Sequence, residues 1–176
     1  MDDQYLSLLR RLPKRITSSP RVRVKEINRG YRLDLDAESI PNDEIQELHK
    51  FSLFFRQSID LPERFSAGLQ WLRPPTPDVY LMLARYNGVH RHTNTHTDGH
   101  AFHGFHRHIG LAQFLDHPSI AFEHHAEPVA YASYHGAIRQ LMQDCGLVNG
   151  PDFFDVLGVP PTGAGQQGIF SFDESF

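Results

Sequence analysis

The sequence predicts a single α+β domain with a mostly antiparallel sheet and flanking helices. Three observations lead to this prediction: a β-hairpin pattern near the N-terminus, two dense apolar strands in the middle of the chain, and an amphipathic helix after them. The chain of 176 residues is 40% hydrophobic and 22% charged, which is enough to bury one core. We expect residues 1–157 to form this domain and residues 158–176 to form a flexible C-terminal tail.

The first third of the chain is expected to hold two helices with a hairpin between them. Residues 3–16 show helical spacing of leucines. Residues 21–27 and 31–37 alternate apolar and polar side chains, and Asn28–Gly30 between them has turn chemistry, which predicts the hairpin. Residues 41–58 predict a second helix, whose apolar side would carry Ile45, Leu48, Phe51 and Phe55.

The rest of the chain predicts three strands and a final helix. Residues 64–72 and 78–88 are apolar strand patterns, and Asn87-Gly88 is expected to end the second of them in a turn. Residues 102–109 predict the third strand. The chain after Pro118 reads as loop, and residues 127–147 predict the helix, with Gly146 as its stop.

Charge and cysteine content favour a soluble cytoplasmic protein. The formal net charge of −4 counts against sequence-independent phosphate binding, although basic residues gather near the N-terminus. Cys145 is the single cysteine, so no intrachain disulfide can form, which fits a reducing cytosol. No apolar run reaches the roughly 18 residues that a membrane span needs, so we expect no membrane association.

Seven of the twelve histidines lie between His90 and His108. His106 and His108 are two apart on a predicted strand and therefore share a face. If this strand pairs with the preceding one, His92 can meet that pair, and the loop between the strands, with Asp98, His96 and His100, can fold over them.

Three interpretations of this cluster remain open. In the first, His90, His92, His106 and His108 bind zinc or another divalent transition metal and leave a position for water. In the second, His92, His106 and His108 act as general acid and base in RNA cleavage, with Arg85 (or Arg91 or Arg107) as the cation and Asn94 as a positioning group. In the third, the histidines line a binding surface and do no chemistry.

The stretches "LARYNGVHRHTN" and "FHGFHRHI" resemble a loose group of small, uncharacterised bacterial and prophage proteins, some of them toxin-like. The shared pattern is carried by Arg85, Tyr86, Asn87, Gly88, His90, His92, Asn94, His106, His108 and Ile109. The resemblance covers about residues 65–147 and implies a setting of toxin–antitoxin modules or phage conflict. It implies no particular reaction, and His96, His100 and His103 depart from the pattern.

Together these features predict a toxin-like hydrolase that acts on RNA by histidine acid–base chemistry. The alternatives are a metal-dependent enzyme or metal-binding protein, and a non-enzymatic interaction or inhibitor protein. RNA is the expected substrate partner, and the C-terminal tail, ending in "GIFSFDESF", is expected to dock on an antitoxin or another protein, or to add a strand in a homodimer.

Overall fold

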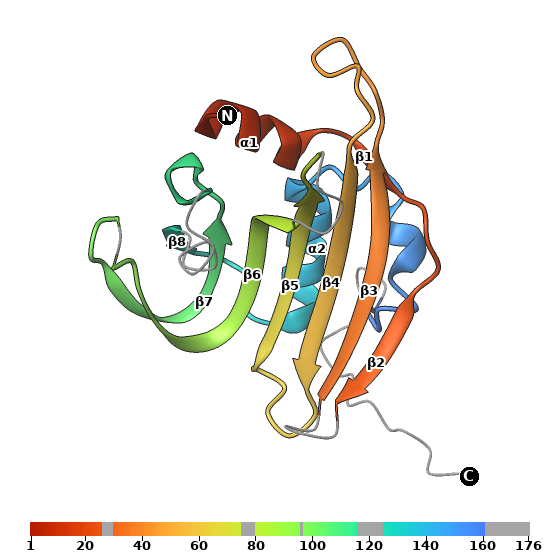
Figure 1. The fold of residues 1–176 in the computed structure, drawn as a ribbon. Coiled ribbons are helices and arrows are strands. Elements are labelled where there is room, and N and C mark those ends of the chain that lie inside the picture. The colour runs from red at the N-terminus through yellow and green to blue at the C-terminus, as the bar shows by residue number, and fades with distance from the viewer. Residues whose placement is uncertain (26–29, 75–79, 96, 116–124, 161–176) are drawn as a thin grey trace.

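The structure is a computed structural model, and it describes residues 1–25, 30–74, 80–95, 97–115 and 125–160. One antiparallel sheet of eight strands dominates it, in the order β1-β3-β4-β5-β6-β7-β8, with β2 also paired to β3 (Figure 1). The expected α+β fold with a mostly antiparallel sheet and flanking helices is thus confirmed.

Eight strands and two helices make up the described part of the chain. The strands are β1 (Lys14–Ile16), β2 (Arg21–Lys25), β3 (Gly30–Ser39), β4 (Lys50–Ser58), β5 (Phe65–Leu72), β6 (Tyr80–Thr93), β7 (Ala101–Ile109) and β8 (His125–Pro128). The helices are α1 (Asp3–Arg11) and α2 (Tyr134–Asp144), with short 3₁₀ turns at Ala112–Phe114 and Gly150–Phe153. No helix among these described residues is long and apolar enough to cross a membrane.

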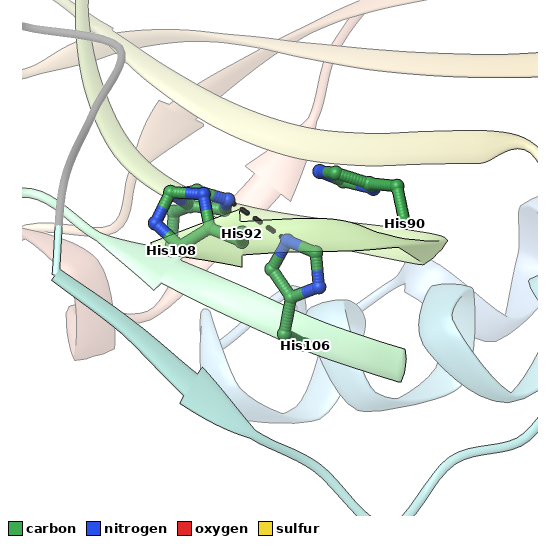
Figure 2. Close-up of side chains that lie close together, drawn as sticks. All are labelled: His90, His92, His106 and His108. Atoms are coloured by element: carbon green, nitrogen blue, oxygen red, sulfur yellow. Dashed lines mark hydrogen bonds between the residues drawn. The ribbon is translucent and has the colours of Figure 1, made fainter. Parts of the chain in front are cut away.

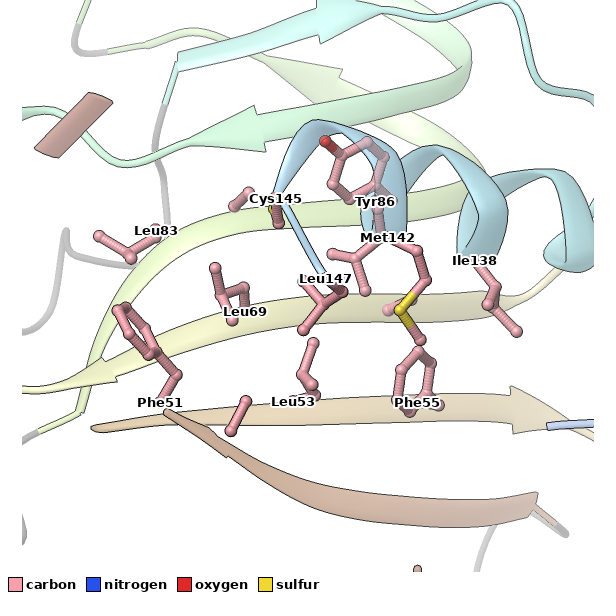
Figure 3. Close-up of a cluster of buried hydrophobic side chains, with 14 of the residues drawn as sticks. Phe51, Leu53, Phe55, Leu69, Leu83, Tyr86, Ile138, Met142, Cys145 and Leu147 are labelled. Carbon is pink, nitrogen blue, oxygen red and sulfur yellow. The ribbon is translucent and has the colours of Figure 1, made fainter. Parts of the chain in front are cut away.

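The two faces of the sheet differ in chemistry because side chains alternate along each strand. On β4, Phe51, Leu53 and Phe55 are buried in the core beneath α2, as Figure 3 shows together with the facing side chains Leu69, Ile138 and Met142. The residues between them point to the opposite face, which we call the open face. The open face carries Asp34 from β3, Ser52 and Arg56 from β4, and Gln70 from β5.

Lys14 joins the two helix ends to the sheet. Its buried Nζ donates hydrogen bonds to the carbonyl oxygens of Arg10 (2.9 Å) and Leu12 (2.6 Å), next to the end of α1. The same ammonium donates to the carbonyl of Cys145 at the end of α2, 3.0 Å away. Carbonyls that a helix end leaves unpaired thereby find a donor inside the protein.

The prediction of a helix over residues 41–58 was wrong, because this stretch contains β4 from Lys50 onward. Its apolar residues fit both a helical and a strand period, since Phe51, Leu53 and Phe55 alternate as well. Partnership with β3 and β5 decides between the two periods. Leu48, placed on the apolar side of the predicted helix, is 55% exposed.

Other boundaries also needed correction. The segment 3–16 divides into α1 and β1, and the helix predicted over 127–147 begins only at Tyr134 because β8 takes its first residues. The hairpin of β2 and β3 is confirmed by the pairing of Val22 with Leu33, while Asn28 and Arg29 of its turn lie outside the described residues.

The predicted turn at Asn87-Gly88 is instead a bulge inside β6, which continues to Thr93. Val159, placed in the predicted tail, packs into the core at 2% exposure. Residues 161–176, the rest of that tail, lie outside the described residues.

A candidate metal centre on the open face

Four histidines from two neighbouring strands meet on the open face of the sheet (Figure 2). His90 and His92 come from β6, and His106 and His108 from β7. Their candidate ligand nitrogens all lie within 4.8 Å of one another, and no other such group of metal-ligating side chains occurs in the described part of the chain. His106 and His108 are buried, His92 is half-buried, and His90 is exposed at the rim.

A β-bulge in β6 makes this convergence possible. Asn87 is paired with His106, whereas the next pair along the ladder joins His90 with Gly104, so β6 has one more residue than β7 between them. Residues paired across a ladder point to the same face, so His90 and His92 share the open face with Asn87. Without the bulge, strict alternation of the same residues would turn both imidazoles toward the helix-covered face.

Contacts from two other segments hold the bulge in place. The amide of Val89 donates to the carbonyl of Glu63 (3.1 Å), and a Cβ at Gly88 would lie 1.7 Å from the same oxygen. Only glycine allows this close approach. From the helix side, the Tyr131 hydroxyl lies 2.9 Å from the carbonyl oxygen of Asn87 and 2.7 Å from that of His106. The hydroxyl therefore bridges β6 and β7 beside the bulge.

The surroundings of His106 determine which ring nitrogen carries its proton. Nδ1 lies 2.9 Å from the carbonyl oxygen of Gly104, which can only accept, so Nδ1 is the protonated nitrogen. The lone pair is then on Nε2, which lies 3.0 Å from His108 Nε2 and 3.4 Å from Asn87 Nδ2. Metal-bound histidines in proteins are oriented in this way by a backbone carbonyl on the other nitrogen.

Asn94 orients His92 in a comparable way. The Asn94 amide is fixed by the backbone of Ala126 on β8, since Oδ1 accepts from Ala126 N (2.9 Å) and Nδ2 donates to Ala126 O (3.0 Å). With the amide orientation set, His92 Nε2 must donate to Asn94 Oδ1 across 3.2 Å. Asn94 thus connects the end of β6, a cluster histidine and β8.

Burial favours the neutral form of His106. The pKa of His106 is lowered to about 4, mainly by burial. The nearby Arg85, His90 and His92 also lower this pKa, whereas the hydrogen bond with the Gly104 carbonyl raises it. The pKa of His90 is lowered as well, chiefly by partial desolvation of its ring, although the residue as a whole is exposed at the rim. Neutral imidazole is the form that binds a metal ion, so the cluster is compatible with a metal site at neutral pH.

The nitrogens fit a transition-metal ion. Zinc binds histidine nitrogen at about 2.0–2.1 Å, which places neighbouring ligand nitrogens of a tetrahedron about 3.3 Å apart. The observed separation of 3.0 Å between His106 Nε2 and His108 Nε2 is close to this value. The candidate ligand nitrogens of His90 and His92 lie within 4.8 Å of this pair and of each other.

The other residues predicted for the site differ in whether they lie beside the histidine cluster. Arg85 is paired with His108 across the ladder, and its buried Nε has no hydrogen-bond partner. Arg107 points to the helix side instead, where it binds Glu127 and Asp144 at 2.9 Å each, so it cannot supply the cation. His96 lies outside the described residues.

Several residues that shape the site were not predicted from the sequence. Gly104, which orients His106, has a φ of +154° that few other residues adopt, and it appeared in the sequence only as one residue of a strand. Tyr131 was assigned to a helix, and β8 was read as helix and loop. The side chain of His125, on β8, lies 3.4 Å from Asn94 Nδ2.

Comparison with known proteins found no match to a protein family, to a curated protein or to a solved structure. The fold and the cluster therefore define the molecule only as an antiparallel α+β protein with a candidate four-histidine metal centre.

Proposed function

We propose that this protein is a metal-dependent hydrolase whose ion is held by His90, His92, His106 and His108. The observation that carries the proposal is the convergence of four imidazoles from two strands, two of them buried, through a bulge that serves to aim them. Seven histidines close in sequence can occur on an inert surface, but two buried ring nitrogens 3.0 Å apart indicate a site.

The ligand set favours zinc among the common metals. Four neutral imidazoles suit zinc, copper, nickel or iron, whereas magnesium and calcium prefer oxygen ligands. The cluster contains no carboxylate. Zinc supplies a bound water whose pKa is lowered to about 7, which is a nucleophile at neutral pH.

The different burial of the four histidines suggests a different role for each as a ligand. His92, His106 and His108 lie deeper and would hold the ion, and His90 at the exposed rim would be the ligand that exchanges with water. In the hydrolysis, the water oxygen forms the new bond to the electrophilic atom of the substrate. The leaving group departs with the electron pair of the broken bond and takes up a proton.

Metal-free cleavage of RNA by acid–base catalysis is the second candidate. The half-buried Arg85, with its unpartnered Nε, favours it, because a cation beside the histidines would stabilise a charged transition state. A general acid and a general base must reach opposite sides of a phosphate, however, and His106 and His108 are hydrogen-bonded to each other. The toxin-like or phage-conflict setting, and the non-enzymatic inhibitor, remain predictions from the resemblance.

Metal analysis of protein purified without a histidine tag tests the proposal. We expect about one equivalent of a transition metal, and we expect the His106→Ala/His108→Ala double variant to lose it. The His100→Ala/His103→Ala variant removes two histidines from the same region outside the cluster and should keep the metal. Cobalt(II) added to the metal-free protein should give the visible absorption of a tetrahedral site.

Protein that stays metal-free in the presence of zinc would contradict the proposal. If such protein cleaves RNA and loses that activity in the double variant, the acid–base candidate is supported instead.

A further inference from the structure

We propose that the hollow beside the histidine cluster binds a phosphate group, so that the substrates of this site are phosphate esters of about nucleotide size. The substrate class rests on the proposed hydrolase function, whereas phosphate binding by the hollow can be tested separately. The hollow has a volume of about 650 Å³, within the range of ligand pockets in proteins. His90 belongs both to its wall and to the cluster.

The wall of the hollow is basic in a protein that is acidic overall. Arg32, Arg56, Arg64 and Arg91 line it, and no Asp or Glu occurs among the described residues of the wall. The whole chain has a net charge of −4. A concave surface lined by one sign of charge concentrates ligands of the opposite sign, here anions.

Two of these arginines are held in position by their neighbours. Arg32 and Arg56 are paired across β3 and β4, and both guanidinium groups stack on the Phe54 ring, at 5.5 Å and 4.9 Å from its centroid. Arg32 also binds Asp34 at 2.7 Å. None of the ion pairs between described residues involves Arg56, Arg64 or Arg91, so their charges remain for a ligand.

A bound anion would relieve an unfavourable arrangement of charge. Burial and the like charge of Arg32 lower the pKa of Arg56, and the charge of Asp34 opposes them only in part. Cations that have been taken partly out of water beside one another are stabilised by an anion. Guanidinium groups also match the oxygens of phosphate with paired hydrogen bonds.

The sheet leads from the hollow to the metal centre in one row of paired residues. Arg56 is opposite Ser66, Ser66 is opposite Asn87, and Asn87 is opposite His106. The row spans three strand spacings, or about 14 Å, which suits a ligand larger than a phosphate ion. Ser66 Oγ, in the middle of the row and on the wall of the hollow, is buried without a hydrogen-bond partner.

The test measures binding of four probes to the zinc-loaded full chain: inorganic phosphate, adenosine 5′-monophosphate, a short single-stranded oligoribonucleotide, and uncharged adenosine. We expect the phosphate-bearing probes to bind and adenosine to bind at least tenfold more weakly. In Arg56→Gln/Arg64→Gln, binding should weaken about tenfold or more, since two charged donors are lost. The control Arg11→Gln/Arg15→Gln makes the same charge change outside the hollow and should bind as the wild type does.

The same experiment shows whether the phosphate comes from RNA or from a free nucleotide, and it tests phosphate binding separately from the hydrolase function. Tighter binding of the oligoribonucleotide would assign the hollow to RNA, and tighter binding of the mononucleotide to free nucleotides; either result supports phosphate recognition. Equal binding of adenosine, or unchanged phosphate binding in a folded Arg56→Gln/Arg64→Gln variant, would overturn it. Metal content is measured on every sample, so a protein that binds phosphate but no metal refutes only the hydrolase.

Discussion

At the scale of single residues, the site depends on groups that never need to touch a substrate. Gly104 fixes the proton of His106 through its carbonyl, and Asn94 fixes that of His92 through its amide oxygen. Each of these partners is itself held by the β6–β7–β8 ladder. The chemistry of the imidazoles is therefore set by the backbone around them.

Replacement of Asn94 by Ala should weaken zinc binding by about 10- to 100-fold, because His92 loses the acceptor that orients it. The dissociation constant can be measured by competition with a chelator of known affinity. Asn149→Ala is a matched control, since Asn149 holds the backbone of Ile16 with the same two amide contacts far from the cluster. A loss of stability without a loss of zinc affinity in Asn94→Ala would contradict this role.

The sequence could predict part of the candidate site from spacing alone. The H-x-H pair of His106 and His108 shares a face on any strand, and an adjacent strand brings His92 near it. His90 was also named as a ligand, but the face that His90 and His92 share, and the orientation of the rings through Gly104 and Ala126, depend on a bulge and on a strand pairing that distant residues decide. Arg56 belongs to a segment that looked helical, so its place near the site could not be foreseen.

At the scale of elements, the bulge of β6 is held by contacts from two other segments of the chain. The carbonyl of Glu63 accepts a hydrogen bond from the amide of Val89. The hydroxyl of Tyr131 lies within hydrogen-bond distance of the carbonyls of Asn87 and His106. Bulges next to functional sites commonly re-aim side chains, and this one turns two histidines to the open face. The strands β2, β3 and β5 were predicted correctly because their apolar residues fit only the strand period. The apolar residues of β4 fit both the strand and the helix period, so β4 was wrongly predicted to be helical.

Tyr131→Phe should lower the free energy of unfolding by about 1–2 kcal/mol, because two buried carbonyls lose their shared donor. Urea denaturation measures this change, and zinc affinity should fall with it as the bulge loosens. Tyr5→Phe, on α1, is the control and should change neither quantity appreciably. Wild-type stability and zinc affinity in Tyr131→Phe would show that the bridge does not hold the bulge.

At the scale of the whole molecule, the reactivity of the single cysteine depends on whether the core around it stays closed. Cys145 is fully buried at the end of α2, burial raises its pKa to about 12, and its carbonyl accepts from Lys14. The thiol can react only when the helix end leaves the sheet, since the thiolate is the reactive form.

Alkylation of Cys145 at pH 8 should therefore be far slower in the native protein than in urea, and slower again with zinc bound. A ligand that binds only the folded state reduces opening by the factor 1 + [L]/Kd. Mass spectrometry after timed exposure to iodoacetamide measures the rate, and the zinc effect should vanish in His106→Ala/His108→Ala. Rapid labelling of the native wild type would show that the core near α2 is open.

The single extra residue at Gly88–Val89 also has a consequence for finding relatives of this chain. With the present spacing but no bulge, the two imidazoles would lie behind the sheet, whereas a chain with one residue fewer between Asn87 and His90 would place them on the open face by plain alternation. The useful search signature is therefore either N-G-x-H-x-H-x-N, which needs the bulge, or the shorter N-x-H-x-H-x-N, which does not, each followed by G-x-H-x-H. In genome surveys, this phase of the pattern separates true counterparts from chains that are merely rich in histidine.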